Sequence, residues 1–224
     1  ALLGEDRNIV TDISGTTRDA VDTHFNAFGF DLTLVDTAGI RKKSKVHEDI
    51  EFYSVMRAIR AIEDCDVCLF MIDANEGLQK QDLSIFSVVE KNKKGVVLLI
   101  NKWDTINKET STTKEYEEDI LSKIAPFTDL PILFVSALNK QRIHKALETA
   151  MDVYKNRTQK ISTSKLNEFI QDAIERNAPP SIKGKYVKIK YVTQLPTHSP
   201  TFAFFCNLPQ YVKDPYKRYL ENQL

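Results

Sequence analysis

No apolar run in this 224-residue sequence approaches the ~20 residues that a membrane-spanning helix needs. The chain does not open with a basic segment followed by an apolar one, so no secretory signal peptide is indicated. Hydrophobic residues make up 42% and charged residues 28% of the chain, a profile typical of soluble globular proteins. These absences argue against a membrane protein, and the cytoplasm is the expected location.

Cysteine is scarce, with three residues in the whole chain. The spacing of Cys65 and Cys68 is compatible with a redox motif or with half of a metal site. Cys68 falls inside an apolar segment, however, and no second cysteine pair or nearby histidine completes a zinc site. We therefore expect buried or half-buried thiols.

The net charge is zero, but the charges are unevenly distributed. Residues 161–224 contain nine Lys or Arg and five Asp or Glu, so this tail is basic and the rest of the chain is acidic. The chain lacks an initiator Met, residues 1–4 resemble the end of a helix, and a helix that opens at Asp214-Pro215 is expected to continue to Leu224. We expect a fragment cut at both ends.

The first two thirds of the chain alternate between apolar strands and amphipathic helices. The predicted strands are 20–28, 32–36, 67–72, 96–100 and 132–135, and the predicted helices are 52–62, 81–92, 113–125 and 142–154. This alternation predicts an α/β fold with a mostly parallel sheet covered on both faces. Ligands bind at the carboxyl ends of such strands, where the polar residues Asp36, Asn101 and Ser136 follow them.

The remainder of the chain predicts a small α/β module after a polar linker. A helix capped by Ser164 is followed by strands at 186–194 and 201–206 and by the helix from Pro215. Within the first strand, Lys188 and Lys190 are expected on one face and the apolar residues on the other. A basic strand beside aromatic residues is compatible with RNA phosphates or with a solvated surface.

The strongest chemical motif is Asn101-Lys102-Trp103-Asp104, at the end of a buried strand. The Asp104 carboxylate can accept both adjacent donors of a guanine ring, N1–H and the exocyclic amine, which adenine lacks. Asn101 can contact the other edge of the ring, and the stem of Lys102 can lie over its face. A chance polar turn is the alternative for this motif taken alone.

Three further segments follow the same logic. Asp36-Thr37-Ala38-Gly39 ends a strand, where Asp36 suits a water-mediated Mg²⁺ contact and Gly39 lets its N–H approach a phosphate. After the strand 132–135, the N–H of Ala137 in Ser136-Ala137 is positioned to reach the guanine O6. A Thr hydroxyl in residues 15–19, G-T-T-R-D, can complete the Mg²⁺ shell. Each segment alone fits an ordinary turn or loop, but the ordered set makes that reading improbable.

The set resembles the GTPases of the translation-factor class, and more closely the tandem-GTPase ribosome-assembly family known as Der or EngA. The resemblance is carried by residues 15–19, 36–42 (D-T-A-G-I-R-K), 101–104, 191–194 (Y-V-T-Q), 200–202 and 216–220. It covers nearly the whole chain and implies a G domain at 1–157, of the P-loop NTPase type but lacking its first strand and P-loop. A KH-like domain at 158–224, truncated at its end, is implied to follow.

The resemblance also implies ligands and site residues. Thr17 would belong to a switch segment and, with Asp36, would hold Mg²⁺; Thr17, Asp36 and Gly39 would serve catalysis. GTP or GDP would contact the following residues: Asp36, Thr37, Ala38, Gly39, Ile40, Asn101, Lys102, Trp103, Asp104, Ser136 and Ala137.

Two departures from the general GTPase pattern stand out. No G-x-x-x-x-G-K-[S/T] loop occurs in the chain, so we expect this chain alone to bind GTP poorly and not to hydrolyse it. Position 40 is Ile, where many GTPases have a Gln that orients the attacking water. The resemblance implies a K⁺ ion in the whole protein instead.

The implied role is a GTP-hydrolysing switch in the assembly of the large ribosomal subunit, with that subunit, its RNA and a preceding G domain as partners. No Gly-x-x-Gly loop is present in the tail, which argues against base-specific RNA recognition and for docking on ribosomal RNA or on the neighbouring G domain. Two alternatives remain: a non-catalytic G-domain platform for RNA, and a tRNA-modifying GTPase with the same G-T-T-R-D loop. The strand-bearing tail argues against the second alternative.

Overall fold

The computed structural model describes residues 21–36, 56, 58–107, 112–182, 184–197 and 199–224, and these residues form a mixed α/β chain. The chain divides into two compact units, Ala1–Lys155 and Asn156–Leu224. Helix α4 (Ile143–Thr158) crosses this division. The domain boundary predicted after residue 157 lies in its last turn and stays a prediction.

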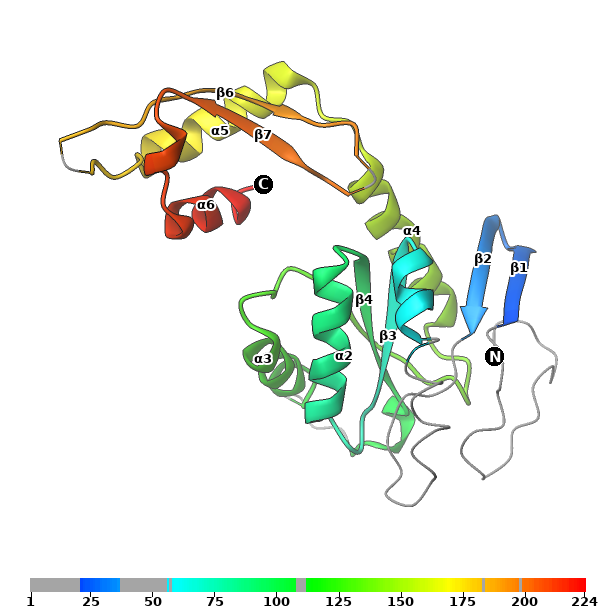
Figure 1. Ribbon diagram of the computed structural model, residues 1–224. Coiled ribbons are helices and arrows are strands. Elements are labelled where there is room, and N and C mark those ends of the chain that lie inside the picture. Colours follow the sequence, from blue (N-terminus) through cyan, green and yellow to red (C-terminus); the bar gives the residue numbers. More distant parts are fainter. Residues whose placement is uncertain (1–20, 37–55, 57, 108–111, 183, 198) are drawn as a thin grey trace. The chain divides into compact units, whose positions relative to one another are not determined.

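The first unit contains a three-stranded parallel sheet in the order β3-β4-β5. The strands are β3 (Val67–Asp73), β4 (Gly95–Asn101) and β5 (Ile132–Phe134), as Figure 1 shows. Helices α2 (Lys80–Lys91), α3 (Thr112–Ile124) and α4 run between and after these strands, close to the predicted ranges. The predicted parallel α/β architecture is confirmed.

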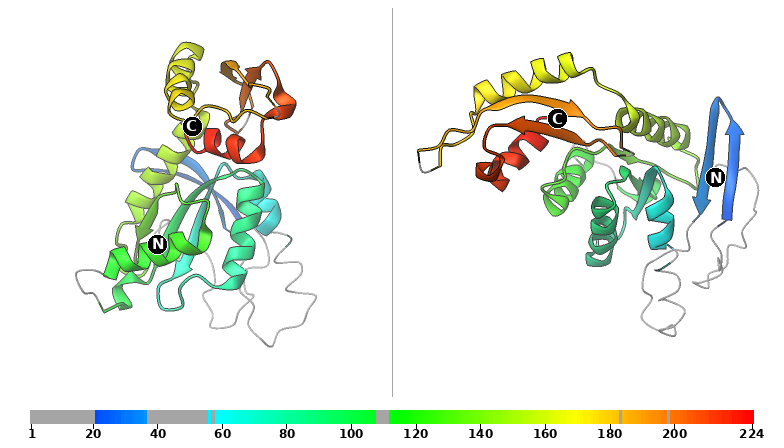
Figure 2. Two further views of the ribbon diagram at one scale, coloured as in Figure 1. Left: turned by 90° about the vertical axis from the view of Figure 1, so that its left-hand side faces the viewer. Right: turned by 45° about the horizontal axis from the view of Figure 1, so that its top comes forward.

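The central strand β4 explains why both faces of the sheet are covered. Val96, Leu98 and Ile100 point into one apolar cluster, which includes residues of α2 and α3. Val97 and Leu99 point into a second cluster with residues of α4. Successive side chains of a strand alternate between its faces, so an uninterrupted apolar run requires helices on both sides (Figure 2).

An antiparallel hairpin precedes the sheet, formed by β1 (Val21–Ala27) and β2 (Phe30–Asp36). Its two-residue turn has positive φ at both Phe28 (55°) and Gly29 (81°), the backbone that matches the twist of a hairpin. The ring of Phe28 contacts His144 of α4 edge to face, with centroids 4.6 Å apart. This ring contact links the tip of the hairpin to α4 of the same unit.

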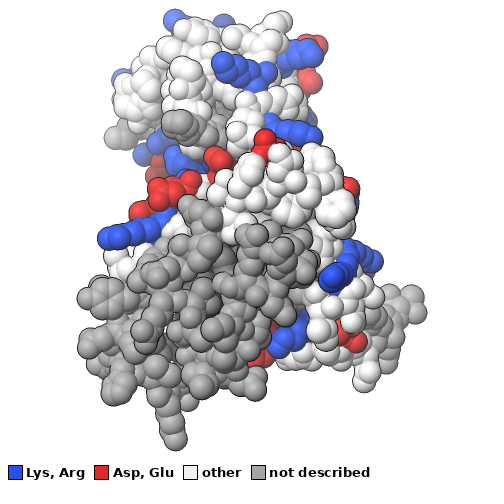
Figure 3. Space-filling view, turned by 90° about the vertical axis from the view of Figure 1, so that its right-hand side faces the viewer, with Lys and Arg blue, Asp and Glu red and all other residues white. Residues whose placement is uncertain are grey.

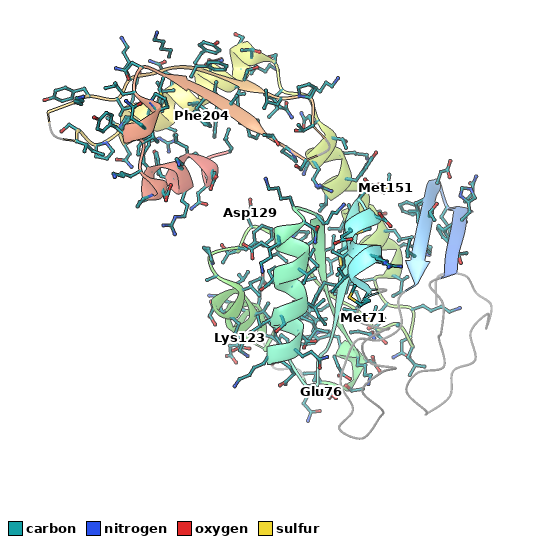
Figure 4. The ribbon with its side chains drawn as sticks, viewed as in Figure 1. Met71, Glu76, Lys123, Asp129, Met151 and Phe204 are labelled. Carbon is teal, nitrogen blue, oxygen red and sulfur yellow. The ribbon has the colours of Figure 1, made fainter. Side chains whose placement is uncertain are left out.

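The second unit follows the predicted order of helix, strand, strand and helix. It comprises α5 (Thr163–Arg176), the antiparallel pair β6 (Ile189–Gln194) and β7 (Phe202–Cys206), and α6 (Asp214–Glu221). Leu166 and Ile170 of α5 pack on Val192, with Phe204, labelled in Figure 4, against them. This unit therefore has an apolar core of its own.

Three details of the second unit differ from the sequence-based expectation. The N-cap of α5 is Ser162, whose hydroxyl accepts the N–H of Lys165, so Ser164 lies inside the first turn. A register irregularity between Ile189 and Tyr191 breaks the predicted alternation along β6, because an inserted residue shifts the faces of a strand. Helix α6 ends at Glu221 and does not run to Leu224.

The cysteines match the expectation of buried or half-buried thiols. Cys65, Cys68 and Cys206 are free and half-buried. Burial, with a smaller contribution from the neighbouring Cys65, raises the pKa of the Cys68 thiol to about 12. Cys68 therefore stays protonated and unreactive at neutral pH.

Candidate functional site

The carboxyl ends of β3, β4 and β5 meet at one edge of the first unit, where Glu76 is labelled in Figure 4. Asp73 pairs in register with Asn101, and the Ala74 N–H donates to the Asn101 carbonyl at 2.9 Å. The Trp103 N–H donates to the carbonyl of Val135, next to Ser136, at 3.1 Å. Two motifs separated by more than thirty residues in the sequence, around Asn101 and Ser136, are thereby brought together.

Asn101 is held by the strand that follows it. Its Oδ1 accepts the backbone N–H of Ala137 at 2.9 Å, across 36 positions of sequence. An N–H donor must face the amide oxygen, so this bond presents the Asn101 Nδ2 amine as the donor on the other side. The Ala137 N–H, which the sequence suggested for the guanine O6, is engaged with Asn101 in this structure.

Lys102 adopts a left-handed backbone, with φ 61° and ψ 30°. For a residue with a Cβ this conformation costs roughly 1–3 kcal/mol and persists only where surrounding contacts impose it. The Lys102 ammonium pairs with Asp73 Oδ2 at 2.6 Å. Partial burial by itself raises the pKa of Asp73, but the hydrogen bonds from Lys102 and Asn75 lower it by more, so that pKa lies below its ordinary value.

The Trp103 side chain lies in the apolar core and is 7% exposed. Its ring packs on Phe134 with centroids 4.3 Å apart and meets Tyr116 edge to face at 5.5 Å. Trp103 is among the predicted nucleotide contacts, but its side chain points into the core and only its backbone lies at the site. Its role in the structure is to fix the turn that carries its neighbours Lys102 and Asp104.

Asp104 carries the most informative atom of the site. Its Oδ1 is buried and has no hydrogen-bond partner among the residues that the structure describes. A buried carboxylate oxygen without a donor costs free energy, roughly 1–3 kcal/mol or more for a charged group. Such an atom in a folded protein calls for a physical explanation.

Ser136 is fully buried and closes a tight loop. Its Oγ accepts the N–H of Asn139 at 3.1 Å, and its backbone forms an antiparallel bridge with Gln141. Ser136 therefore shapes the loop from which Ala137 reaches Asn101.

The phosphate and metal half of the predicted site falls largely outside the described residues. This applies to Thr17, Thr37, Ala38, Gly39 and Ile40. The backbone of Asp36 is described as the last residue of β2. Within the described part of the chain, no group of three or more His, Cys, Asp or Glu side chains is placed to hold a metal ion.

Two further residues, neither of them part of a predicted motif, support Lys102. Asn75 donates to Asp73 and to Thr105, and Thr105 contacts Lys102. The only sequence signal is the polar run D-A-N-E-G directly after the strand 67–72. Nothing in that run identifies its partners, because these are set by the neighbouring strand.

No helix among the described residues has the length and apolarity to span a bilayer.

Solved structures with the same fold include GTP-binding proteins. Era in complex with MgGDPNP and a segment of 16S ribosomal RNA matches 99% of the chain and 80% of its own length, at a TM-score of 0.59 and 22% identity. Era from Aquifex aeolicus bound to GDP·AlF4⁻ matches with a TM-score of 0.58 and 21% identity over the same shares of the two chains. At these identities the likeness shows the fold alone.

Family models and curated relatives give the closer match. Residues 1–102 match the model of the 50S ribosome-binding GTPases, and residues 160–224 match the KH-domain-like C-terminal domain of EngA bacterial GTPase enzymes. GTPase Der of Flavobacterium johnsoniae is 63% identical over all 224 residues, and that of Christiangramia forsetii is 62% identical. The chain covers 51% and 52% of these proteins, so it spans about half their length. The chain belongs to the Der (EngA) family of GTPases.

Proposed function

We propose that this chain supplies the guanine-recognition site of a protein that hydrolyses GTP to GDP and phosphate. The proposal rests on Asp104, whose buried Oδ1 has no hydrogen-bond partner in the described part of the chain, and on Asn101, whose amide is oriented by Ala137. Guanine offers two adjacent N–H donors to a carboxylate and an acceptor, N7, to an amide amine. Asp104 and Asn101 provide the complementary groups.

The same pair of residues would reject adenine. Adenine has no donor at N1, so the Asp104 carboxylate would remain buried without a partner in an adenine complex. A site built to hydrogen-bond a donor discriminates strongly against a ligand that lacks it. The Lys102 stem would cover one face of the base.

The experiment replaces the Asp104 carboxylate, which has two acceptor oxygens, with an amide, which has one acceptor and one donor. In the whole protein, Asp104→Asn should weaken GDP binding at least a hundred-fold and strengthen binding of xanthosine diphosphate, whose C2 oxygen needs a donor. Equilibrium titration with fluorescent GDP and XDP analogues measures both affinities. Unchanged GDP affinity would refute the guanine assignment.

The phosphates and Mg²⁺ would be held by the segments around Thr17 and around Asp36, Thr37, Ala38, Gly39 and Ile40. Thr17 and Asp36 carry the oxygen ligands that Mg²⁺ prefers, and the bound ion would neutralise phosphate charge. Gly39 allows a close approach of its backbone N–H to a phosphate.

Turnover requires more than this chain. No G-x-x-x-x-G-K-[S/T] motif occurs in its 224 residues, so hydrolysis by this chain alone should be undetectable in a phosphate-release assay. Ile40 has no group that can orient water, and we propose that K⁺ assists the whole protein. Equal hydrolysis rates in Na⁺ and K⁺ would count against that.

The second unit is proposed to dock on ribosomal RNA, with the large subunit as the assembly target and a preceding G domain as a further partner. Tyr191 and Phe205 stack at 4.3 Å and 11° on the exposed side of β6 and β7, each more than 40% exposed. Exposed lysines lie on and before β6: Lys185, Lys188 and Lys190. Among the charged residues in view, Figure 3 shows mainly Lys and Arg over its upper part, which is the second unit. Stacked aromatics beside lysines suit RNA bases and phosphates.

A further inference from the structure

A closed ring of side-chain contacts lies at the carboxyl ends of β3 and β4, beside the proposed guanine site. We propose that Asp73, Asn75 and Thr105 are positioning residues for nucleotide binding, and that they act through Lys102. The inference rests on the proposed function, because it concerns how the guanine-binding turn is held.

The ring can be followed atom by atom. Asp73 Oδ2 pairs with the Lys102 ammonium at 2.6 Å, while Asp73 Oδ1 accepts the Asn75 N–H at 2.9 Å and Asn75 Nδ2 at 3.1 Å. Asn75 Nδ2 also donates to Thr105 Oγ1 at 2.9 Å. Thr105 Oγ1 then donates to the Lys102 carbonyl at 2.8 Å. Both the side chain and the backbone of Lys102 are thus tied to one network.

The backbone contact matters because Lys102 is left-handed, with φ 61°. That conformation is unfavourable for a residue with a side chain and depends on contacts that hold it. The Thr105 hydroxyl and backbone N–H both bond the Lys102 carbonyl and close the turn. Relaxation of Lys102 would redirect the chain two residues later, at Asp104, and move its carboxylate away from the guanine donors.

The side-chain contact matters because the lysine stem is long and flexible. The Lys102 side chain is 57% exposed, so burial alone does not fix it. A lysine that samples many rotamers loses that freedom when a ligand binds, which weakens affinity. The Asp73 carboxylate, itself held by Asn75, restricts the ammonium before the nucleotide arrives.

The ring contributes little to folding, so its effect on binding can be measured separately. Asn75 and Thr105 are both exposed, and exposed hydrogen bonds and ion pairs add little to the free energy of unfolding. Their replacement should therefore leave the thermal midpoint of the nucleotide-free protein within error. The loss should appear in nucleotide affinity.

The experiment measures dissociation of fluorescent GDP from the whole protein by stopped flow, and the phase that Asp104→Asn removes is taken as the one from this site. Asn75→Ala and Thr105→Val should each speed dissociation about five-fold, a net loss of the size expected when exposed hydrogen bonds that hold Lys102 are removed. Thr149→Val is the matched control, because the Thr149 hydroxyl likewise donates to a carbonyl, that of Lys145, at 2.8 Å in α4. The control should dissociate at the wild-type rate.

A double-mutant comparison tests whether the ring acts through Lys102. Lys102→Ala removes the side chain but keeps the backbone carbonyl that Thr105 bonds, so Asn75→Ala added to it should have clearly less than its five-fold effect on dissociation. A full additional five-fold loss, or wild-type rates in both single variants, would overturn the inference. The Asp104→Asn exchange separates this inference from the proposed function. If the exchange switches specificity but the ring variants behave as wild type, only the inference is wrong. If the exchange does not switch specificity, the proposed function is wrong.

Discussion

The fold changes the pKa of Asp73, because it brings two chain segments together at this carboxylate. Its carboxylate has a lowered pKa because Lys102, from the end of the next strand, and Asn75 bond the charged form. A carboxyl group with a depressed folded-state pKa stabilises the fold above its unfolded pKa of about 3.9, and that stabilisation is lost as the pH falls through the folded value.

One prediction at the scale of a single residue follows from this lowered pKa. Asp73→Asn should lower the free energy of unfolding of the first unit at pH 7, by about 1 kcal/mol or less since Lys102 is more than half exposed. The difference from wild type should shrink as the pH falls below about 4. Urea unfolding followed by the fluorescence of Trp103, the only tryptophan and a core residue of this unit, measures it. The exposed Asp129→Asn is the control, and a constant difference at all pH values would contradict the argument.

Residue-level predictions from sequence succeed where the chemistry needs only residue type and order. The sequence places Asn101 and Ser136 after strands, and the parallel sheet brings the two ends together. It does not reveal that Trp103 points into the core or that Ala137 bonds Asn101. Those directions depend on φ and ψ in two turns, including the left-handed Lys102, which no local pattern specifies.

At the scale of elements, one side chain joins α5 to β6. Asn167 Nδ2 donates to the Val192 carbonyl and Asn167 Oδ1 accepts the Val192 N–H, both at 2.8 Å. Val192 is fully buried, so these backbone groups depend on protein partners. The pair acts as a substitute for a neighbouring strand.

Asn167→Ala should therefore leave two buried backbone groups unpaired and destabilise the second unit by about 2 kcal/mol. Amide hydrogen exchange measured by NMR should become at least ten-fold faster at Val192 and its neighbours in β6. Gln171→Ala on the same helix, where an exposed amide bonds Glu175, serves as the control. Exchange at Val192 that matches the control would show that Asn167 is dispensable.

The positions of most elements are readable from periodicity, because apolar spacing records which face is buried. The cap at Ser162 and the irregularity in β6 are not. Ser162 and Ser164 are equally good caps by residue type, and the choice depends on where packing of Leu166 and Ile170 sets the helix phase. A register irregularity likewise depends on the partner strand.

At the scale of the whole molecule, the two units have separate cores and separate proposed tasks. The first contains the proposed nucleotide site, and the second carries the stacked pair Tyr191 and Phe205. If the second unit docks on RNA through that pair, the two rings contribute stacking that does not depend on sequence.

The double variant Tyr191→Ser with Phe205→Ser should weaken binding of the whole protein to single-stranded ribosomal RNA segments at least ten-fold, at roughly 1–3 kcal/mol per stacked base. The dependence of affinity on salt should be retained, because the lysines remain. Fluorescence anisotropy across a salt series gives both quantities. Phe28→Ser, which removes an exposed ring from the first unit, is the control, and an equal loss there or no loss in the double variant would reject the RNA surface.

The order of motifs along the chain was enough, by itself, to predict the family and the parallel α/β fold, because both depend on residue type and spacing. The guanine-binding segments stay a prediction from the same pattern. The tertiary structure alone decided the rest: which oxygen of Asp104 is buried without a donor from the described residues, which N–H orients Asn101, and which residues hold Lys102. The physical reason is that hydrogen-bond partners across strands are chosen by distance and direction in space. Sequence separation carries no information on either.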